Sequence, residues 1–289
     1  MTEKDFNPAK ITAMALDLDG TLLKPDKTLS DRTVNALRTC IKKDIQIILA
    51  TGRAVDSGEK YRKIIGVSGP QVYYNGAEVV DLDAGKIIHK RFIKPEPILY
   101  CVRLARQTGV YFQVFFPAGT VDAPFREGQN SGEILMAEKL TPEVEAYRKS
   151  TGIEVIIGDL EEQLMQAPAV IKGMFITNEE NNKKIRPILQ EQFGNSIYIV
   201  QSSPNFLEIL AQGVSKGFGL ECALEYLKLK PENTIAFGDE ENDLPMFKAA
   251  GFSAAPANAP DIVRKAAAFQ IPANREDGVA VFLEKYFKK

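Results

Sequence analysis

Two carboxylates stand one residue apart in the run D-L-D-G-T at residues 17–21. Side by side, the carboxylates of Asp17 and Asp19 repel each other, so the pKa of one rises unless a cation neutralises the pair. A hard divalent metal ion with oxygen ligands meets that need. Gly20, which follows Asp19, permits a backbone path that other residues resist. The run therefore favours a metal-binding turn over an ordinary solvated turn.

A second acidic run, G-D-E-E-N-D, occupies residues 238–243. It places four carboxylates within five residues, beginning at Asp239 and ending at Asp243. These side chains could complete a metal site with Asp17 and Asp19. The alternative is an acidic helix start that merely suits the positive end of a helix dipole.

Two further segments could hold an anion. In the turn A-T-G-R, the hydroxyl of Thr51 and the backbone amide of Gly52 can bind phosphate oxygens, although Thr51 could equally cap a helix. Arg53, the last residue of that turn, could be an ordinary surface ion-pair residue. Lys216 lies at the start of a predicted helix, where the helix dipole disfavours a cation. It therefore indicates a nearby anion such as a phosphate, unless it is simply solvated.

The elements that must position these residues alternate between strands and helices. Buried strands are expected at residues 11–18, 45–50, 72–74, 233–237 and 252–255, and helices at residues 31–42, 217–228, 244–250 and 278–287. This rhythm predicts an α/β fold with a Rossmann-like, doubly wound parallel sheet. Because ligands bind in the crevice at the carboxyl ends of such strands, the separated segments are expected to share one site.

The middle of the chain differs, and the alternation of apolar and polar residues expected of a sheet with one solvated face is plain at residues 196–202. Strands are expected at residues 110–116, 170–177, 196–202 and 206–210, and helices at 97–107 and 181–193. We interpret this part as a smaller α+β domain inserted into the first. The core domain is then expected at residues 1–83 and 205–289, and the insert at residues 84–204.

The composition of the 289-residue chain disfavours some classes of binding partner. The formal net charge is −2, from 36 basic and 38 acidic side chains, so no nucleic-acid or membrane partner is expected. The first ten residues lack the apolar stretch of a signal peptide, and no apolar run approaches the about 20 residues of a membrane-spanning helix. A cytoplasmic protein is therefore expected. The sequence does not indicate an oligomeric state.

The chain contains a single histidine, His89, in a segment that is typical of an exposed strand. Ser-His-Asp catalysis and multi-histidine metal sites are thereby disfavoured. The three cysteines are far apart and form no C-x-x-C pair, so neither a disulfide framework nor a thiolate zinc site is expected. Any chemistry must then come from carboxylates, hydroxyls, lysine or amides.

Taken in order, D-x-D-G-T, the threonine of A-T-G-R, the lysine and G-D-x-x-N-D resemble the haloacid dehalogenase superfamily of phosphotransferases. The large insert between the threonine and the lysine resembles its type II cap. The phrases Y-N-G-A at 74–77, F-L-E-I at 206–209 and N-R-E-D-G-V-A at 274–280 resemble the Cof-type sugar-phosphatase branch, which has a class IIB cap. The resemblance spans nearly the whole chain after Lys10.

The resemblance implies a magnesium-dependent phosphatase. Asp17 would be the nucleophile that forms an aspartyl-phosphate, and Asp19 would be the general acid for the leaving alcohol and then the base for water. Mg²⁺ would be bound by Asp17, the main-chain carbonyl of Asp19, and Asp239. Asp243 would support the metal or its waters from behind these ligands.

The resemblance also implies how the phosphoryl group is held. Thr51, the amide of Gly52, Lys216 and Asn242 would contact its oxygens. The physics agrees, because phosphoryl transfer needs in-line placement and neutralisation of the charge on the equatorial oxygens. The substrate would be a small phosphorylated metabolite, similar to a sugar phosphate.

Alternatives remain within and outside this chemistry. A phosphomutase or phosphotransferase uses the same nucleophile, but the family's mutases generally carry D-x-D-G-V where this chain has Thr21. Dehalogenation is disfavoured because that branch lacks the aspartate present here as Asp19. A non-catalytic phosphate-binding protein could lose either carboxylate, yet both are present. The insert is expected to close over the crevice, and Arg126 and Glu127 are candidate substrate contacts, unless they belong to an ordinary surface loop.

Overall fold

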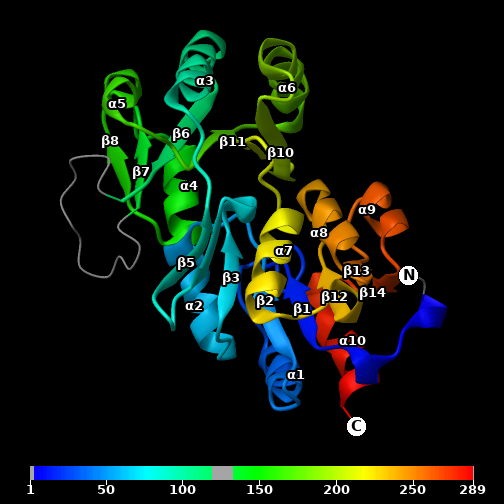
Figure 1. Ribbon diagram of the computed structural model, residues 1–289. Coiled ribbons are helices and arrows are strands. Elements are labelled where there is room, and N and C mark those ends of the chain that lie inside the picture. Colours follow the sequence, from blue (N-terminus) through cyan, green and yellow to red (C-terminus); the bar gives the residue numbers. More distant parts are fainter. Residues whose placement is uncertain (1–2, 119–132, 289) are drawn as a thin grey trace. The chain divides into compact units, whose positions relative to one another are not determined.

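The computed structural model describes residues 3–118 and 133–288 (Figure 1). The chain divides into two compact units. The first comprises Met1–Arg53, Gly58–Lys90 and Ser215–Lys289, and the second comprises Ala54–Ser57 and Arg91–Val214. The domain limits expected from the sequence, at residues 84 and 204, stay predictions.

The first unit is built on a five-stranded parallel sheet with the order β14-β13-β12-β1-β2. Its strands are β1 (Ala13–Leu16), β2 (Gln46–Leu49), β12 (Thr234–Phe237), β13 (Phe252–Pro256) and β14 (Phe269–Ile271). The central strand β1 pairs in parallel with β12 on one side and with β2 on the other. Every residue of β1 and β12 is buried, as expected of a parallel strand that is covered on both faces.

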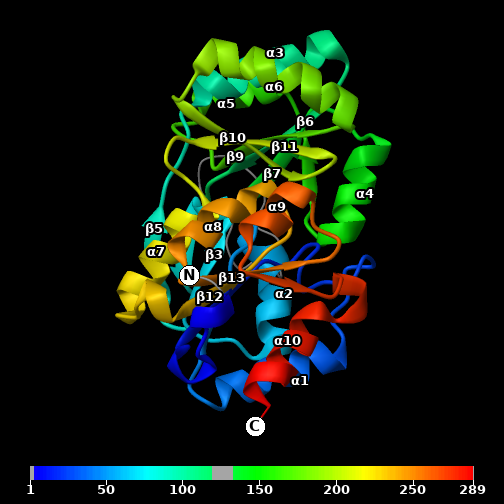
Figure 2. The same cartoon turned by 90° about the vertical axis from the view of Figure 1, so that its right-hand side faces the viewer.

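Helices cover both faces of this sheet. They are α1 (Asp31–Ile41), α2 (Val55–Ile65), α7 (Lys216–Leu227), α8 (Leu244–Ala249), α9 (Asp261–Ala266) and α10 (Gly278–Phe287). One apolar cluster joins the sheet to α1 and α10, which lie side by side in Figure 2, and a second joins it to α7, α8 and α9. The expected doubly wound α/β fold is confirmed.

A small antiparallel sheet, with the order β3-β4-β5, extends the first unit. Its strands are β3 (Pro70–Tyr73), β4 (Glu78–Asp81) and β5 (Lys86–Lys90). His89 lies in β5, which confirms the expected strand, but its side chain is only half-exposed and packs edge-on against the Phe218 ring, with 4.9 Å between centroids. The strand expected at residues 72–74 ends one residue early, because Tyr74 has a left-handed backbone with φ of 48°.

The second unit is an α+β arrangement around a six-stranded sheet with the order β10-β11-β9-β6-β7-β8. Its strands are β6 (Tyr111–Phe116), β7 (Ile134–Ala137), β8 (Val155–Ile157), β9 (Lys172–Ile176), β10 (Ile197–Ser203) and β11 (Phe206–Ala211). Its helices are α3 (Pro95–Thr108), α4 (Pro142–Thr151), α5 (Leu160–Gln166) and α6 (Glu179–Phe193). Figure 2 shows α3, α5 and α6 on one face of this sheet. The elements β7, β8, α4 and α5 were not expected from the sequence.

An ion pair is buried within the second unit. The Nζ atom of Lys172 lies 2.8 Å from Oε2 of Glu208, and both side chains are almost fully buried. The ammonium group also lies 4.7 Å from the centroid of the Phe115 ring, and the hydroxyl of Ser202 donates a hydrogen bond to Glu208. Removing one member of such a pair leaves a buried charge without its counter-charge.

We therefore expect Lys172→Met to lower the free energy of unfolding by about 3–5 kcal/mol. The matched control is Lys183→Met, because Lys183 pairs with Glu179 on an exposed helix surface. That change should cost less than about 0.5 kcal/mol. Thermal and denaturant unfolding of the two variants provide the measurement. Equal destabilisation would contradict the importance of the buried pair.

Within the described residues, no helix combines the length and apolar character that a membrane span requires.

Candidate active site

Three predicted site residues follow neighbouring strands of the main sheet. Asp17 comes directly after β1, Thr51 lies two residues beyond β2, and Asp239 lies two residues beyond β12. Because the three strands are parallel neighbours, their carboxyl ends meet at one edge of the sheet. The backbone N–H of Asp17 donates to the carbonyl of Phe237, the last residue of β12, at 3.0 Å. The expected convergence of these segments is confirmed.

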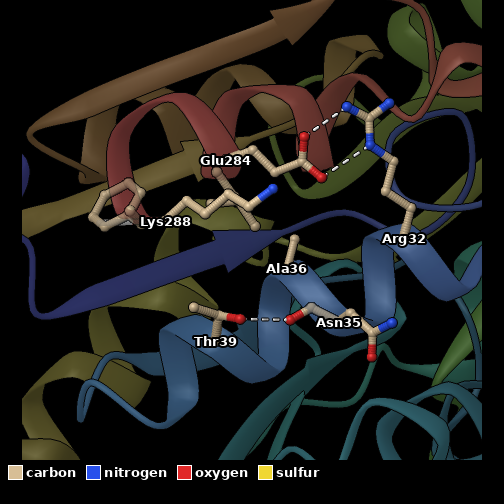
Figure 3. A pocket seen from close by; sticks show the side chains of 8 residues that line it. Arg32, Asn35, Ala36, Thr39, Glu284 and Lys288 are labelled. Atoms are coloured by element: carbon tan, nitrogen blue, oxygen red, sulfur yellow. Dashed lines mark hydrogen bonds and ion pairs between the residues drawn. The ribbon is translucent and has the colours of Figure 1, made fainter.

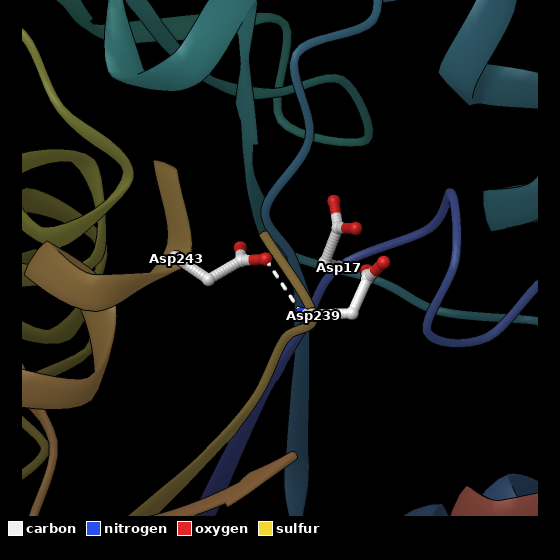
Figure 4. Close-up of side chains that lie close together, drawn as sticks. All are labelled: Asp17, Asp239 and Asp243. Carbon is white, nitrogen blue, oxygen red and sulfur yellow. Dashed lines mark hydrogen bonds between the residues drawn. The ribbon is translucent and has the colours of Figure 1, made fainter. Parts of the chain in front are cut away.

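The carboxylates of Asp17, Asp239 and Asp243 form a buried cluster (Figure 4). One oxygen from each lies within 4.8 Å of the others. Oδ2 of Asp243 accepts hydrogen bonds from the backbone N–H groups of Asp239, at 2.9 Å, and Glu240, at 3.0 Å. The hydroxyl of Thr21 donates to Oδ1 of Asp239 at 2.7 Å. These three hydrogen bonds hold the carboxylates of Asp239 and Asp243 in fixed positions.

Gly20 allows this cluster to form. Its φ of 83° is in the left-handed region, and a Cβ atom at this position would lie 2.0 Å from Oδ2 of Asp239. Any side chain would therefore displace a carboxylate of the cluster.

Lys216 is the cation of the cluster. Its Nζ atom donates to Oδ1 of Asp17 at 2.6 Å and to Oδ1 of Asp243 at 2.7 Å, and its side chain is 1% exposed. Ser215 begins α7 by accepting a hydrogen bond from the N–H of Phe218, which fixes the start of the helix and hence Lys216. The unfavourable effect of the helix dipole on Lys216 is thus offset by two carboxylates, and Lys216 is not the solvated lysine that the sequence also allowed.

Negative charge remains in excess at this cluster. Burial raises the pKa of Asp17 to about 7, against the attraction of Lys216. Burial, with the nearby charges of Asp17 and Asp243, raises the pKa of Asp239 well above its usual value. Burial would lower the pKa of Lys216, but the two carboxylates raise it. Three carboxylates facing one ammonium group fit a hard divalent cation with oxygen ligands.

The carboxylate of Asp19 lies outside this cluster. Arg53 donates to it twice, from Nε to Oδ2 at 2.6 Å and from Nη2 to Oδ1 at 2.8 Å, and Nζ of Lys27 contacts Oδ1 at 2.8 Å. Burial alone would raise the pKa of Asp19, but Arg53 and then Lys27 lower it to about 2. Arg53 is 7% exposed, so it is not the surface ion-pair residue that the sequence also allowed. The Asp19 carbonyl as a metal ligand stays a prediction.

The residues expected to hold the phosphoryl group lie on two turns. Thr51 is buried, and its hydroxyl accepts a hydrogen bond from the backbone N–H of Arg53 at 3.1 Å, with Gly52 between them. Asn242 is buried in the short 3₁₀ helix that follows β12, and its Nδ2 donates to Oδ1 of Asn75 at 2.9 Å. The roles of these residues toward a substrate stay predictions.

Two residues of this region were missed by the sequence analysis. Nothing in the sequence around Lys27 indicates that it contacts Asp19. Asn75 belongs to the Y-N-G-A phrase, and its Asn-Gly pair is a known signal for a positive φ, which would have pointed to a special backbone position. Arg126 and Glu127, the candidate substrate contacts, lie outside the described residues.

A pocket elsewhere in the first unit contains none of the predicted site residues. It has a volume of about 240 Å³ and lies between α1 and α10 (Figure 3). Arg32 spans it with two hydrogen bonds to Glu284, from Nε at 3.0 Å and from Nη2 at 2.6 Å. The carboxylate cluster lies elsewhere, at the carboxyl edge of the sheet.

Residues 14–283 match the haloacid dehalogenase-like hydrolase family, and the chain belongs to this family. Within this family the chain belongs to the Cof-type, class IIB branch, because it has a parallel core sheet and an inserted mixed sheet. The chain is a phosphatase, a phosphoric monoester hydrolase acting on small phosphorylated metabolites. The family is typically metal-dependent, and the three buried aspartates could bind the metal.

Individual relatives support this assignment. The 5-amino-6-(5-phospho-D-ribitylamino)uracil phosphatase YitU of Bacillus subtilis is 30% identical over 279 residues, which cover 95% of this chain and 97% of the relative. A haloacid dehalogenase-like hydrolase from Bacteroides thetaiotaomicron matches with a TM-score of 0.80 and 26% identity, over 96% of this chain and 100% of that one. A subclass IIB sugar phosphatase shares the fold with a TM-score of 0.76, at 23% identity, over 95% and 98% of the two chains.

Proposed function

We propose that this protein is a magnesium-dependent phosphatase that hydrolyses a sugar-phosphate-like ester through an aspartyl-phosphate on Asp17. The observation that carries the proposal is the buried cluster of Asp17, Asp239 and Asp243 around Lys216 at the carboxyl edge of the sheet. In this arrangement the Asp17 carboxylate lies beside a cation and two further carboxylates. Phosphoryl transfer to a carboxylate requires such neutralisation of charge.

The reaction has two steps. An Asp17 carboxylate oxygen attacks phosphorus, the bond from phosphorus to the ester oxygen breaks, and Asp19 gives its proton to the departing alcohol. Asp19 then takes a proton from a water molecule, which attacks the phosphorus of the aspartyl-phosphate. The acyl-phosphate bond breaks, inorganic phosphate leaves, and the Asp17 carboxylate and the protonated Asp19 are regenerated.

Four residues would hold the phosphoryl oxygens. Lys216 supplies a positive charge, the hydroxyl of Thr51 and the backbone amide of Gly52 supply donors, and the side-chain amide of Asn242 supplies another. Donors that are already buried and positioned need little reorganisation as charge develops. We infer that these four residues bind the phosphoryl group.

The metal ligands in this proposal are oxygen atoms. Asp17, the main-chain carbonyl of Asp19 and Asp239 would hold Mg²⁺, and Asp243 would support them through the backbone N–H of Asp239. When bound, the ion would neutralise charge on the phosphoryl oxygens and on the attacking carboxylate.

Asp19 must change partners to act as the acid. Its carboxylate is held by Arg53 and Lys27, and a carboxylate paired with two cations is a poor proton donor. A bound phosphate ester carries negative charge of its own and competes for these cations. We infer that substrate binding releases Asp19 toward the ester oxygen.

The organic part of the substrate is inferred from chemistry shared among relatives. One is named for a phosphate on a ribityl chain, and another is named as a sugar phosphatase. Both names describe phosphate monoesters of polyhydroxylated carbon chains. We infer an ester of that class, whose alcohol is a poor leaving group and needs a proton. A phosphomutase would pass the phosphoryl group to a sugar hydroxyl in place of water.

The test compares wild type with Asp19→Asn on two kinds of ester. On sugar phosphates the variant should lose about 10²–10⁴-fold in kcat, because the alcohol cannot leave without its proton. On p-nitrophenyl phosphate the variant should release about one equivalent of nitrophenolate rapidly, because nitrophenolate leaves without being protonated. Further turnover should be slow, because no base activates the water that hydrolyses the phosphoenzyme. Stopped-flow absorbance and inorganic phosphate assays measure both phases.

The control is Asp44→Asn, since Asp44 is exposed near the amino end of β2 and Asn tolerates its left-handed backbone. It should behave as wild type. If wild type released no inorganic phosphate from a broad panel of esters, the proposed function would be wrong. An equal loss on both ester types, without the rapid phase, would contradict only the role of Asp19.

A further inference from the structure

A strained turn follows β3 at the edge of the candidate site. Tyr74, Asn75 and Gly76 have consecutive positive φ values of 48°, 54° and 95°, and all three residues are buried. An aromatic residue at positive φ is a genuine outlier, whereas asparagine and glycine adopt the left-handed region more readily, so the strain lies at Tyr74. Such strain persists only where the surrounding structure determines the backbone, and it tends to occur at functional sites.

The backbone of this turn is tied to the Thr51–Arg53 segment. The N–H of Asn75 donates to the carbonyl of Thr51 at 2.9 Å, and the N–H of Tyr74 donates to the carbonyl of Arg53 at 3.0 Å. These two bonds hold the turn against the segment expected to bind phosphoryl oxygens.

The other side of the turn lies against the start of α7. A Cβ atom on Gly76 would be 2.0 Å from the carbonyl oxygen of Ser215, the residue before Lys216. The backbone can approach this closely only because residue 76 is glycine. The strained turn therefore touches two separate segments of the candidate site through its backbone alone.

The side chain of Asn75 reaches the third segment. Its Oδ1 accepts the hydrogen bond from Nδ2 of Asn242 at 2.9 Å. Asn242 is 3% exposed, and its Oδ1 accepts no hydrogen bond from the described part of the chain. Asn75 thus fixes the amide of Asn242 at its nitrogen. The amide oxygen is an acceptor without a partner in the described part of the chain, which is unfavourable for stability.

We propose that Asn75 is a positioning residue for phosphate binding, an inference that rests on the proposed function. By accepting one hydrogen of Asn242 Nδ2, Asn75 fixes the plane of that amide and leaves the second hydrogen for a phosphoryl oxygen. If the amide of Asn242 rotated by half a turn, its Oδ1 would face the Oδ1 of Asn75, and two acceptors would repel. Asn75 does not itself contact the substrate; it acts through Asn242.

The test uses Asn75→Gly, because glycine adopts the same positive φ without strain and removes only the side chain. The matched control is Lys228→Gly at the end of α7, where φ is 57° and no predicted site residue lies nearby in the chain. Both proteins are examined with Mg²⁺ present. Calorimetry measures the dissociation constant for inorganic phosphate, and thermal unfolding reports stability.

Asn75→Gly is expected to weaken phosphate binding by about 10-fold, the scale of one hydrogen bond to an anion, and to raise KM for esters by a similar factor. Lys228→Gly should bind phosphate as wild type does. In an Asn242→Ala background, Asn75→Gly should change phosphate binding by less than about twofold, because the residue through which it acts is gone. A purely structural role would shift the thermal midpoint without this coupling.

Two results would overturn the inference: wild-type phosphate affinity in Asn75→Gly, or losses that simply add in the double variant. If Asn75→Gly does not fold, Asn75→Ala replaces it in the same cycle of wild type, two single variants and the double variant. Phosphate binding at equilibrium requires no turnover, so the cycle reports on Asn75 independently of hydrolysis. If the two asparagines were coupled in phosphate binding but wild type hydrolysed no ester, the positioning role of Asn75 would be supported and the proposed function contradicted.

Discussion

Asp17→Asn is expected to abolish turnover while leaving the protein folded. An asparagine amide is a poor nucleophile toward phosphorus, and loss of a covalent nucleophile lowers kcat by roughly 10⁴-fold or more. The fold should survive, because Lys216 keeps its contact with Asp243 at 2.7 Å. Burial raises the pKa of Asp17 to about 7, so a neutral amide there also removes a charge that the buried site tolerates poorly.

Three measurements test this expectation. Steady-state assays give kcat, thermal unfolding gives a midpoint that should equal or exceed that of wild type, and mass spectrometry of rapidly quenched reactions detects the phosphoenzyme. Wild type should carry one phosphoryl group on the peptide that contains Asp17, and the variant none. Turnover within about 100-fold of wild type, or a phosphoryl group on another residue, would refute the nucleophile assignment.

Removal of divalent metal is expected to have an effect of similar size. Asp17, Asp239 and Asp243 bring three carboxylates together, and Lys216 is the one ammonium group that contacts this cluster in the described part of the chain. Without a further cation, an anionic carboxylate must approach an anionic phosphate. Chelation should therefore eliminate turnover, and added Mg²⁺ should restore it.

Metal binding can be measured without turnover, through its effect on thermal stability. A ligand present at about 100 times its dissociation constant stabilises the folded protein by about 2.7 kcal/mol, so Mg²⁺ should raise the thermal midpoint of wild type. Asp239→Asn should lose this shift. Glu241→Gln is the matched control, because Glu241 belongs to the same acidic run but not to the carboxylate cluster. Full activity in chelator, or equal shifts in both variants, would contradict the metal site.

Much of the candidate site could be predicted because parallel sheets bring strand ends together. The short apolar runs before Asp17, Thr51 and Asp239 identify buried strands, and the carboxyl ends of such strands meet at one edge. The fold class follows from the same rhythm of strands and helices. The second unit was less predictable, since β7, β8 and α5 are too short to show a clear periodicity in the sequence.

The sequence by itself determined which chemical groups stand at which strand ends, and hence the class of reaction. The tertiary structure decided which of those groups touch. Lys216 meets Asp17 across 199 residues, and Asn242 meets Asn75 across 167. Hydrogen bonds act over about 3 Å, so partners this far apart in the chain are set only when the strands and helices pack.

Contacts between segments far apart in the chain also explain the two largest differences between the sequence-based expectation and the structure. Local sequence favours a strand through Tyr74, but contacts with Thr51, Arg53 and Ser215 turn the backbone left-handed there. Asp19 follows the same strand as Asp17, yet Arg53 and Lys27 draw its carboxylate away from the cluster. The sequence thus places the proposed nucleophile, whereas packing decides which neighbours hold each carboxylate and amide.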